Sequence, residues 1–457
     1  MLQQDSKVRL NAVCLKRALH WLFGGIAWST IKFRDDCSWT PRLLASAAIL
    51  WAWADESTLV ERFESVRKIV QFAYPRQQQL AHSYQAFIKL LRRWTPQLAA
   101  MIQAAFRGRM QQCLPACWKI DGWLMFAVDG SRIELPRTRS HEKVYSSTRP
   151  SKRRKKSKKK CSRRHAKKAD SPQMWVTTMW HAGTGLPWDW RTGPADSSER
   201  AHLLEMLRGL PGGALIAADA GFVGYEYIRA VVQSGRQLLM RVGTNVRLLR
   251  KLGYVRESQG TVYLWPDQQA KKHQPPLVLR LVVAQGGRHP VYLLTSVCSK
   301  SQMSDAQVAK LYRHRWGIEV YYRHLKQTFD RRKLRSGCAE NAPVEIEWSL
   351  VGLWAMALYS LVEIRRRDTS QRLSIAQTLR AFRRVLRDYR HPSQRGRHLG
   401  DRIRNAVIDS YQRKNKTSRN YPRKKQESPP GAPRLLKASQ HQVKRAKQIA
   451  ALNRRKG

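Results

Sequence analysis

Acidic residues are scarce in this sequence of 457 residues. Asp and Glu number 32 against 86 Lys and Arg, which leaves a formal net charge of +54 at pH 7. This excess is larger than solubility requires. It predicts a polyanionic partner whose affinity falls steeply with added salt, because binding releases condensed counterions. A wholly disordered basic protein is excluded, because 42% of the residues are hydrophobic and 16 are Trp.

Long hydrophobic runs and paired cysteines are also lacking. The longest apolar runs, Leu43–Trp53 and Leu350–Val362, are too short to span a bilayer, and the N-terminus has no signal-peptide pattern. We therefore expect a cytoplasmic, nucleoid-associated protein that does not contact a membrane. Of the seven cysteines only Cys113 and Cys117 are close together, and no second Cys/His pair follows them. This spacing favours reduced structural thiols over a zinc site.

The succession of patterns predicts an α/β protein with several parts. Residues 1–119 have helical periodicity and scattered basic residues, which suit a DNA-end-binding domain or a plain structural bundle. Helical segments are expected on both sides of Pro96. An α/β core is expected over 120–243 and 301–370, interrupted by a β-rich insertion at 244–300. Further helices are expected at 371–411.

Two segments are almost purely basic. Residues 151–168 hold twelve Lys or Arg and no acid, and residues 412–457 hold fifteen against one acid. The first predicts a loop or arm that follows phosphates, although its composition also resembles a localisation signal. The second, at 412–457, predicts a mostly disordered basic tail.

Two short apolar runs each end in an aspartate. Residues 123–128 precede Asp129, and residues 214–218 precede Asp219, so both runs predict buried strands with a carboxylate at the end. A predicted helix over 225–233 and a strand over 237–242 make the second run part of a parallel pair. A lone Asp in such a place is usually a turn residue. Two of them in a chain of this charge favour a functional role.

One long helix is predicted from Ser304 or Asp305 to about Lys333, with Gly337 able to end the segment. Positions three and four apart share one face of this helix. The residues on that face are Tyr312, Arg315, Glu319, Tyr322 and Lys326. One carboxylate among cations and phenols suits chemistry on an anion. The alternative is a solvated face on which Arg315 and Glu319 form an i,i+4 ion pair.

Asp129, Asp219 and Glu319 together predict phosphoryl transfer assisted by two metal ions. Carboxylate oxygens are suitable ligands for two Mg²⁺ or Mn²⁺ ions roughly 3.5–4 Å apart, and nearby Lys and Arg would neutralise the phosphate. Glu199 stands in the sequence Asp196-Ser-Ser-Glu199, which we interpret as a capping box. We therefore treat Glu199 as a helix cap and not as a catalytic residue.

The spacing Tyr312-x2-Arg315-x3-Glu319-x6-Lys326 resembles the Y-R-E-K signature of DDE transposases of the insertion-sequence-four type. The stretches around Asp129 (Ala-Val-Asp-Gly-Ser) and Asp219 (Ala-Asp-Ala-Gly-Phe) resemble the two Asp blocks of that family. The resemblance covers roughly residues 41–340 and includes the β insertion. The basic run at 151–168 and the long tail depart from it.

The resemblance implies an RNase H-like catalytic core with a β-strand insertion, a helical N-terminal domain and a basic, partly disordered C-terminal tail. In such a core Asp129, Asp219 and Glu319 would be the catalytic residues and the ligands of two Mg²⁺ (or Mn²⁺) ions. Tyr312, Arg315 and Lys326 would contact DNA phosphates. Beside them, Trp316 would be either a core residue or a stacking surface for DNA.

The activity implied is cut-and-paste transposition of double-stranded DNA by a homodimer assembled on the DNA. Water would release a 3′-hydroxyl at the transposon end, and this hydroxyl would attack the target. Related enzymes that form a hairpin flip a base onto an aromatic of the insertion, for which Trp265 and Tyr292 are the candidates. Two alternatives remain open from the sequence: a metal-dependent DNA nuclease with the same core, and a non-catalytic basic nucleic-acid-binding protein.

Overall fold

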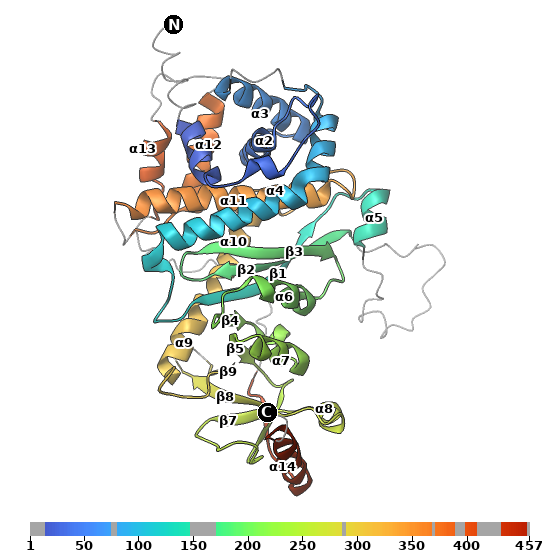
Figure 1. Ribbon diagram of the computed structural model, residues 1–457, viewed down its shortest axis with the longest axis vertical. Helices are drawn as coiled ribbons and strands as arrows, with labels where there is room; N and C mark the ends of the chain where they lie inside the picture. Colours follow the sequence, from blue (N-terminus) through green and yellow to red (C-terminus); the bar gives the residue numbers. More distant parts are fainter. Residues whose placement is uncertain are drawn as a thin grey trace, which may run out of the picture.

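The computed structural model describes residues 14–74, 80–146, 171–285, 289–367, 371–388, 398–408 and 431–454. The basic run at 151–168 and the tail residues 412–430 lie outside the described residues. The N-terminal helices and the helices of residues 342–404 lie at one end of the long axis, and the strands of the 244–300 insertion lie at the other end (Figure 1). The strands of the core lie between these two ends.

The strands form one sheet in the order β10-β6-β7-β8-β9-β5-β4-β1-β2-β3. Strands β1, β4 and β5 are mutually parallel, while β2 and β3 continue from β1 as an antiparallel hairpin. The predicted parallel pair is therefore present. The strands are β1 (Met125–Glu134), β2 (Gln173–His181), β3 (Leu186–Pro194), β4 (Leu215–Ala218), β5 (Gln237–Val242), β6 (Arg247–Arg250), β7 (Thr261–Leu264), β8 (Leu277–Ala284), β9 (Val291–Thr295) and β10 (Arg434–Lys437).

The β-rich insertion is not a separate sheet. Its last strand, β9, pairs antiparallel with β5 on one side and with β8 on the other. Strands β7 and β6 extend the same ladder outward. The insertion therefore lengthens the central sheet, and its backbone hydrogen bonds are continuous with those of the core.

The helices lie on both faces and at one end of this sheet (Figure 1). The α-helices are α2 (Pro41–Trp53), α3 (Leu59–Ala73), α4 (Tyr84–Cys113), α5 (Arg139–Tyr145), α6 (Glu199–Met206), α7 (Tyr225–Gln233), α8 (Asp267–Lys271), α9 (Asp305–His314), α10 (Trp316–Arg323), α11 (Ala342–Arg365), α12 (Ile375–Asp388), α13 (Leu399–Arg404) and α14 (Gln440–Arg454). The expected break at Pro96 is wrong, because α4 continues through this residue. Among the described helices, none combines the length and apolar character needed to cross a bilayer.

The N-terminal helices share a core with α11. Trp53 at the end of α2 donates its indole N–H to the carbonyl oxygen of Gly352 at 2.8 Å. A Cβ at Gly352 would lie 2.9 Å from the Cβ of Ala52, so the two helix backbones approach closely. The N-terminal helices are thus packed onto α11, a helix of the predicted α/β core.

Two arginines, of which Arg331 is buried and Arg383 half-buried, bind the carboxyl end of α2. Arg331 is 1% exposed and donates to the carbonyl oxygen of Ala52 at 3.1 Å, and Arg383 donates to that of Trp53 at 3.0 Å. The last carbonyl groups of a helix have no partner within the helix, so these guanidinium groups satisfy them. Arg331 also joins the segment after the Glu319 helix to the N-terminal helices.

The C-terminal tail differs from the expectation of disorder. Within residues 431–454, β10 pairs in parallel with β6, and α14 follows it. Leu435 and Leu436 of β10 pair with Leu248 and Leu249, which are both buried. A basic composition therefore did not prevent this segment from packing, because its few apolar residues match those of the strand it joins.

Candidate active site

Asp129 lies within β1 and not at its end as predicted. The strand continues to Glu134, because β2 pairs with it along that whole length. The parallel neighbour β4, however, pairs with β1 only as far as Ala127. Asp129 therefore lies just past the end of β4. Asp219 directly follows β4, and its Oδ1 accepts a hydrogen bond from the backbone N–H of Gly221 at 2.8 Å. The two aspartates thus meet at one edge of the parallel strands.

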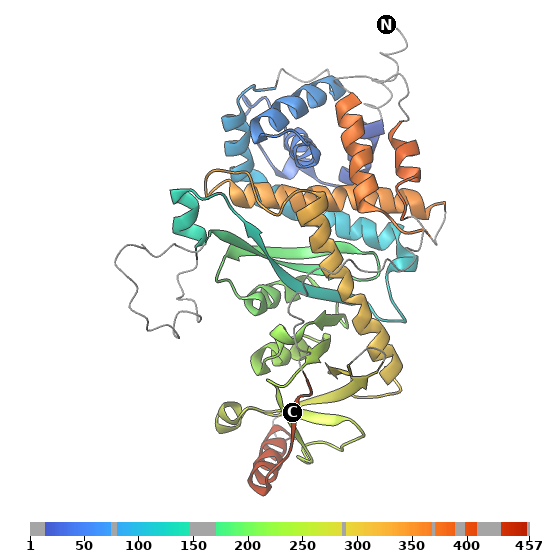
Figure 2. The same cartoon turned by 180° about the vertical axis from the view of Figure 1, so that it is seen from behind.

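The predicted single helix over 304–333 is interrupted twice. Ser304 caps α9 through a capping box with Gln307, and the α-helical hydrogen bonding changes at Arg315, between α9 and α10. From His324 to Thr328 the chain forms a π-helix, which contains Lys326, and the helix ends there. Figure 2 shows α9 and α10 as one diagonal rod across the sheet. A π-helix inside an α-helix often occurs at a functional site.

Helix α10 is fixed to the strand that carries Asp129. The hydroxyl of Tyr322 donates to the carbonyl oxygen of Asp129 at 2.8 Å and to that of Val176 at 3.0 Å. Gly317 lies directly on the ring of Trp180, where a Cβ would be 2.0 Å from the ring. Trp180 pairs with Ala127, which shares a face of β1 with Asp129. Glu319 and Asp129 therefore approach each other on the same face of the sheet.

Gly317→Ala is expected to lower the free energy of unfolding by about 2–3 kcal/mol, because the new methyl group overlaps the buried ring of Trp180. Chemical denaturation measures this change. Gly212→Ala is the matched control, since nothing lies within 4 Å of a Cβ at that position. An unchanged Gly317→Ala protein would mean that α10 does not contact β2 this closely.

The pKa of the Asp129 carboxyl group indicates which charged groups lie near it. Burial raises the pKa of Asp129 to about 6, and the carboxylates of Asp219 and Glu319 contribute to this rise. The Gly130 N–H, which donates to Asp129 Oδ1 at 2.9 Å, and the Arg315 guanidinium oppose this rise. The three predicted carboxylates are thus close enough to influence one protonation equilibrium.

Glu199 is a fourth carboxylate in this region, and its interpretation as a helix cap is wrong. The N-cap of α6 is Ser198, whose side chain accepts from the N–H of Ala201. The Glu199 carboxylate instead lies over Gly130, where a Cβ would be 2.2 Å from its Oε1. Burial raises the pKa of Glu199 to about 7, and Asp129 and Asp219 contribute to the rise. No local pattern indicated this position, since Asp196-Ser-Ser-Glu199 is typical of a capping box.

The basic residues of the predicted stripe surround the same carboxylates. Arg315 Nη2 lies 2.5 Å from Glu319 Oε1, and the guanidinium is 5.7 Å from the ring centre of Tyr312. The i,i+4 ion pair of the plainer interpretation is therefore present as well. Burial lowers the pKa of Lys326, while Glu134 and Asp129 raise it, so the Lys326 ammonium lies near Asp129. We call Asp129, Asp219, Glu319 and Glu199 the acidic group.

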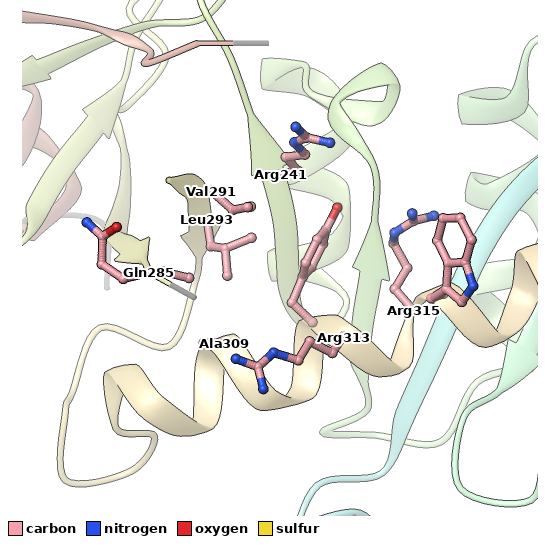
Figure 3. A pocket seen from close by; sticks show the side chains of 10 residues that line it. Arg241, Gln285, Val291, Leu293, Ala309, Arg313 and Arg315 are labelled. Atoms are coloured by element: carbon pink, nitrogen blue, oxygen red, sulfur yellow. The ribbon is translucent and has the colours of Figure 1, made fainter. Parts of the chain in front are cut away.

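A cavity of about 530 Å³ opens beside α9 and α10 (Figure 3). Arg241 of β5 and Arg315 line it, together with Tyr312 and Trp316. The side chain of Trp316 is 62% exposed, so Trp316 is a surface residue and not part of the core. Trp265 is 4% exposed and donates its indole N–H to the Gln274 carbonyl oxygen at 2.8 Å, which makes it a structural residue.

Tyr292, the other aromatic candidate of the insertion, is half-buried in β9. Strand β9 also supplies Val291 and Leu293 to the cavity beside α9. Trp316, Trp265 and Tyr292 were the aromatic residues considered for stacking against a base. Trp316 is the most exposed of the three, and it lies next to Arg315 and Glu319.

The carboxylates suit a divalent cation in type but are not arranged around one. In the part of the chain that the structure describes, no group of three or more His, Cys, Asp or Glu side chains is positioned to hold a metal ion. Glu319 is turned toward Arg315. The fit lies in the donor chemistry: the carboxylates of Asp219 and Glu319 lie near enough to raise the pKa of Asp129, and a divalent cation is the ligand that carboxylate oxygens placed close together can share.

An acidic group on a basic sheet-and-helix scaffold is typical of enzymes that act on nucleic-acid phosphates. Residues 124–353, about half of the chain, match the family model of the transposase DDE domain, and the chain belongs to this family. Within this family, part of the chain is similar to a transposase of the insertion-sequence-four type.

One curated relative is the transposase InsG for insertion sequence element IS4 of Escherichia coli (strain K12). It is 25% identical over 181 residues, which are 38% of this chain and 40% of the relative. The match thus spans less than half of that protein's length. A solved structure of the piggyBac transposase synaptic complex with hairpin DNA aligns over 89% of this chain and 88% of its own, at 13% identity and a TM-score of 0.41.

Proposed function

We propose that this transposase catalyses cut-and-paste transposition of an insertion sequence by metal-dependent hydrolysis followed by strand transfer from a 3′-hydroxyl. One observation carries the proposal: at the edge of the parallel strands, Asp219 and Glu319 lie close enough to Asp129 to raise the pKa of its carboxyl group. The strand order β3-β2-β1-β4-β5 supports an RNase H-like catalytic core.

In this proposal Asp129, Asp219 and Glu319 hold two Mg²⁺ or Mn²⁺ ions. Bound divalent ions would activate the attacking oxygen and stabilise the charge on the leaving oxygen. Binding requires Glu319 to turn from Arg315, and the incoming phosphate can replace Glu319 as the partner of that guanidinium. The Arg315–Glu319 pair then keeps both side chains ordered until DNA arrives.

The remaining members of the stripe contact the DNA in this proposal. Arg315 and Lys326 neutralise phosphate oxygens near the scissile bond, and Tyr312 supports the Arg315 guanidinium with its ring. Trp316 offers an exposed ring to a base of the transposon end, because it borders the cavity next to the acidic group. Transposition joins two ends, so the active assembly would be a homodimer on double-stranded DNA.

Strand transfer distinguishes this function from that of a nuclease with the same core. The substrate is a duplex with the element's terminal sequence and a free 3′-hydroxyl, mixed with supercoiled plasmid and Mg²⁺. We expect covalently joined products, measured on denaturing gels. The matched control carries a 3′-dideoxy end, which cannot attack and is expected to give no joined product. Plasmid nicking without joining would instead indicate a nuclease, and the absence of both would indicate a binding protein.

A further inference from the structure

The C-terminal segment 431–454 is firmly packed on the insertion. Arg434 N donates to the Val246 carbonyl oxygen and Ala438 N to that of Arg250, both at 2.9 Å, which fixes β10 against β6. Helix α14 buries Ala446 and Ile449. The segment therefore holds its backbone at the end of the sheet farthest from the N-terminal helices (Figure 1).

The pairing of β10 with β6 places like charges side by side. In the parallel register Arg434 is opposite Arg247, and Lys437 is opposite Arg250. All four side chains are exposed. Like charges directly opposite one another across neighbouring strands destabilise a sheet. Residues 434 and 437 are three positions apart, so the two pairs project from opposite faces of the strand pair. A polyanion beside either pair would reduce its repulsion.

Within the described ranges, acidic residues compensate these charges only at Arg247, which forms an ion pair with Asp267. In the described parts of 244–300 and 431–452, Lys and Arg number thirteen and Asp and Glu two. Asp267 Oδ2 lies 3.5 Å from Arg247, and Glu257 accepts hydrogen bonds from Gly253 N and Tyr263 Oη. Both acids are therefore engaged locally. Among the described residues, no acidic side chain forms an ion pair with Lys437 or Arg250.

Helix α14 adds further cations to the same end. Arg445 Nη2 donates to the Lys271 carbonyl oxygen at 3.4 Å, so α14 lies against α8. Lys444 and Lys447 of α14 are exposed, as are Lys271 and Lys272 next to it. We call the surface made by β6, β10, α8 and α14 the basic end. Its cations extend over several elements, which matches the spread of phosphates along a duplex better than a single small anion.

We propose that the basic end binds the sugar-phosphate backbone of duplex DNA outside the active site, independently of sequence. Exposed Arg and Lys side chains on an anchored strand and helix can contact phosphate oxygens, and such contacts position DNA without reading bases. The proposal rests on the proposed function only for the identity of this DNA, which would be the part of the element or target beyond the cleaved end.

The test measures the salt dependence of DNA binding by fluorescence anisotropy with a 40-bp duplex of arbitrary sequence and no divalent ion. Four exposed residues of the basic end are changed to Gln in one variant: Arg434, Lys437, Lys444 and Lys447. The matched control removes the same net charge from exposed residues elsewhere: Lys119, Arg208, Arg366 and Arg380.

We expect the log–log salt slope of the basic-end variant to be smaller in magnitude by about 2–4, since each lost phosphate contact removes about 0.9. The control should change by less than about 1. Equal changes in both variants, or an unchanged slope in the basic-end variant, would overturn the proposal. So would a larger loss of binding to phosphatidylglycerol vesicles than to the duplex. This outcome is independent of strand transfer, because the measurement involves no catalysis.

Discussion

Asp129→Asn is expected to abolish metal-dependent cleavage and, at the same time, to stabilise the protein in the absence of metal. Loss of one of three proposed ligands should slow cleavage about a thousandfold or more, which corresponds to about 4 kcal/mol of transition-state stabilisation. Glu319→Gln should have a similar effect on cleavage. Gel-based cleavage assays with Mg²⁺ measure the rates, and DNA binding should be retained in both variants.

The stabilising effect follows from the raised pKa. The ordinary pKa of an Asp side chain is near 3.8, and in the folded protein that of Asp129 is about 6. The folded state binds the proton more tightly, so this group's contribution to stability is fully present below about pH 3.8 and is lost as the pH rises through 6. At pH 7.5 the asparagine variant avoids that loss. We expect it to be more stable than the parent chain by roughly 1–2 kcal/mol.

Thermal unfolding with chelator at pH 4 and pH 7.5 tests this sign. The advantage of Asp129→Asn should disappear at pH 4, and Asp36→Asn at an exposed position should change stability little at either pH. A variant that is less stable at pH 7.5 would contradict the assignment of Asp129 to a repulsive carboxylate group. Activity and stability are thus expected to oppose each other at this residue.

Arg331→Ala is expected to destabilise the fold by about 3–5 kcal/mol. The buried guanidinium donates to Ser349 Oγ at 2.7 Å, to the Phe329 carbonyl oxygen at 2.7 Å and to that of Ala52 at 3.1 Å. Its removal leaves these oxygens without a donor and opens a cavity. Arg331→Lys keeps the charge but not the planar fork, so it should recover only part of the loss.

Arg332→Ala is the matched neighbour. Its side chain is 77% exposed and lies 3.4 Å from Glu134, so the substitution should change stability by less than about 1 kcal/mol. Urea denaturation followed by tryptophan fluorescence compares the three variants. A similar, small effect at both positions would show that Arg331 does not join α2 to the segment behind the Glu319 helix.

Local patterns predicted much of the core. The apolar run before Asp219 and the helix over 225–233 follow from periodicity, and both match the structure. The end of β1 did not follow, because its extension to Glu134 depends on pairing with β2. In the same way β10 depends on β6, which lies almost two hundred residues earlier. Nonlocal pairing is not visible in a local hydrophobic pattern.

The candidate site was predictable in its main residues but not in their surroundings. Helical spacing placed Arg315, Glu319 and Lys326 on one face, and the interruptions at Arg315 and at the π-helix could not be read from residue spacing. Burial distinguished Trp316 from Trp265: Trp316 is 62% exposed and Trp265 is 4% exposed, and this difference depends on tertiary packing. The position of Glu199 depended on Gly130, a contact across 69 positions of sequence.

The double pairing of β9 has a mechanical consequence. Because β9 bonds to β5 and to β8, one uninterrupted ladder runs from the strands beside Asp219 to the outermost strand, β10. The far end cannot swing as an independent lobe without breaking that ladder. A duplex bound at the basic end would therefore lie at a constant distance from the carboxylates. The length of the sheet would then determine how far from the bound segment the DNA is cleaved.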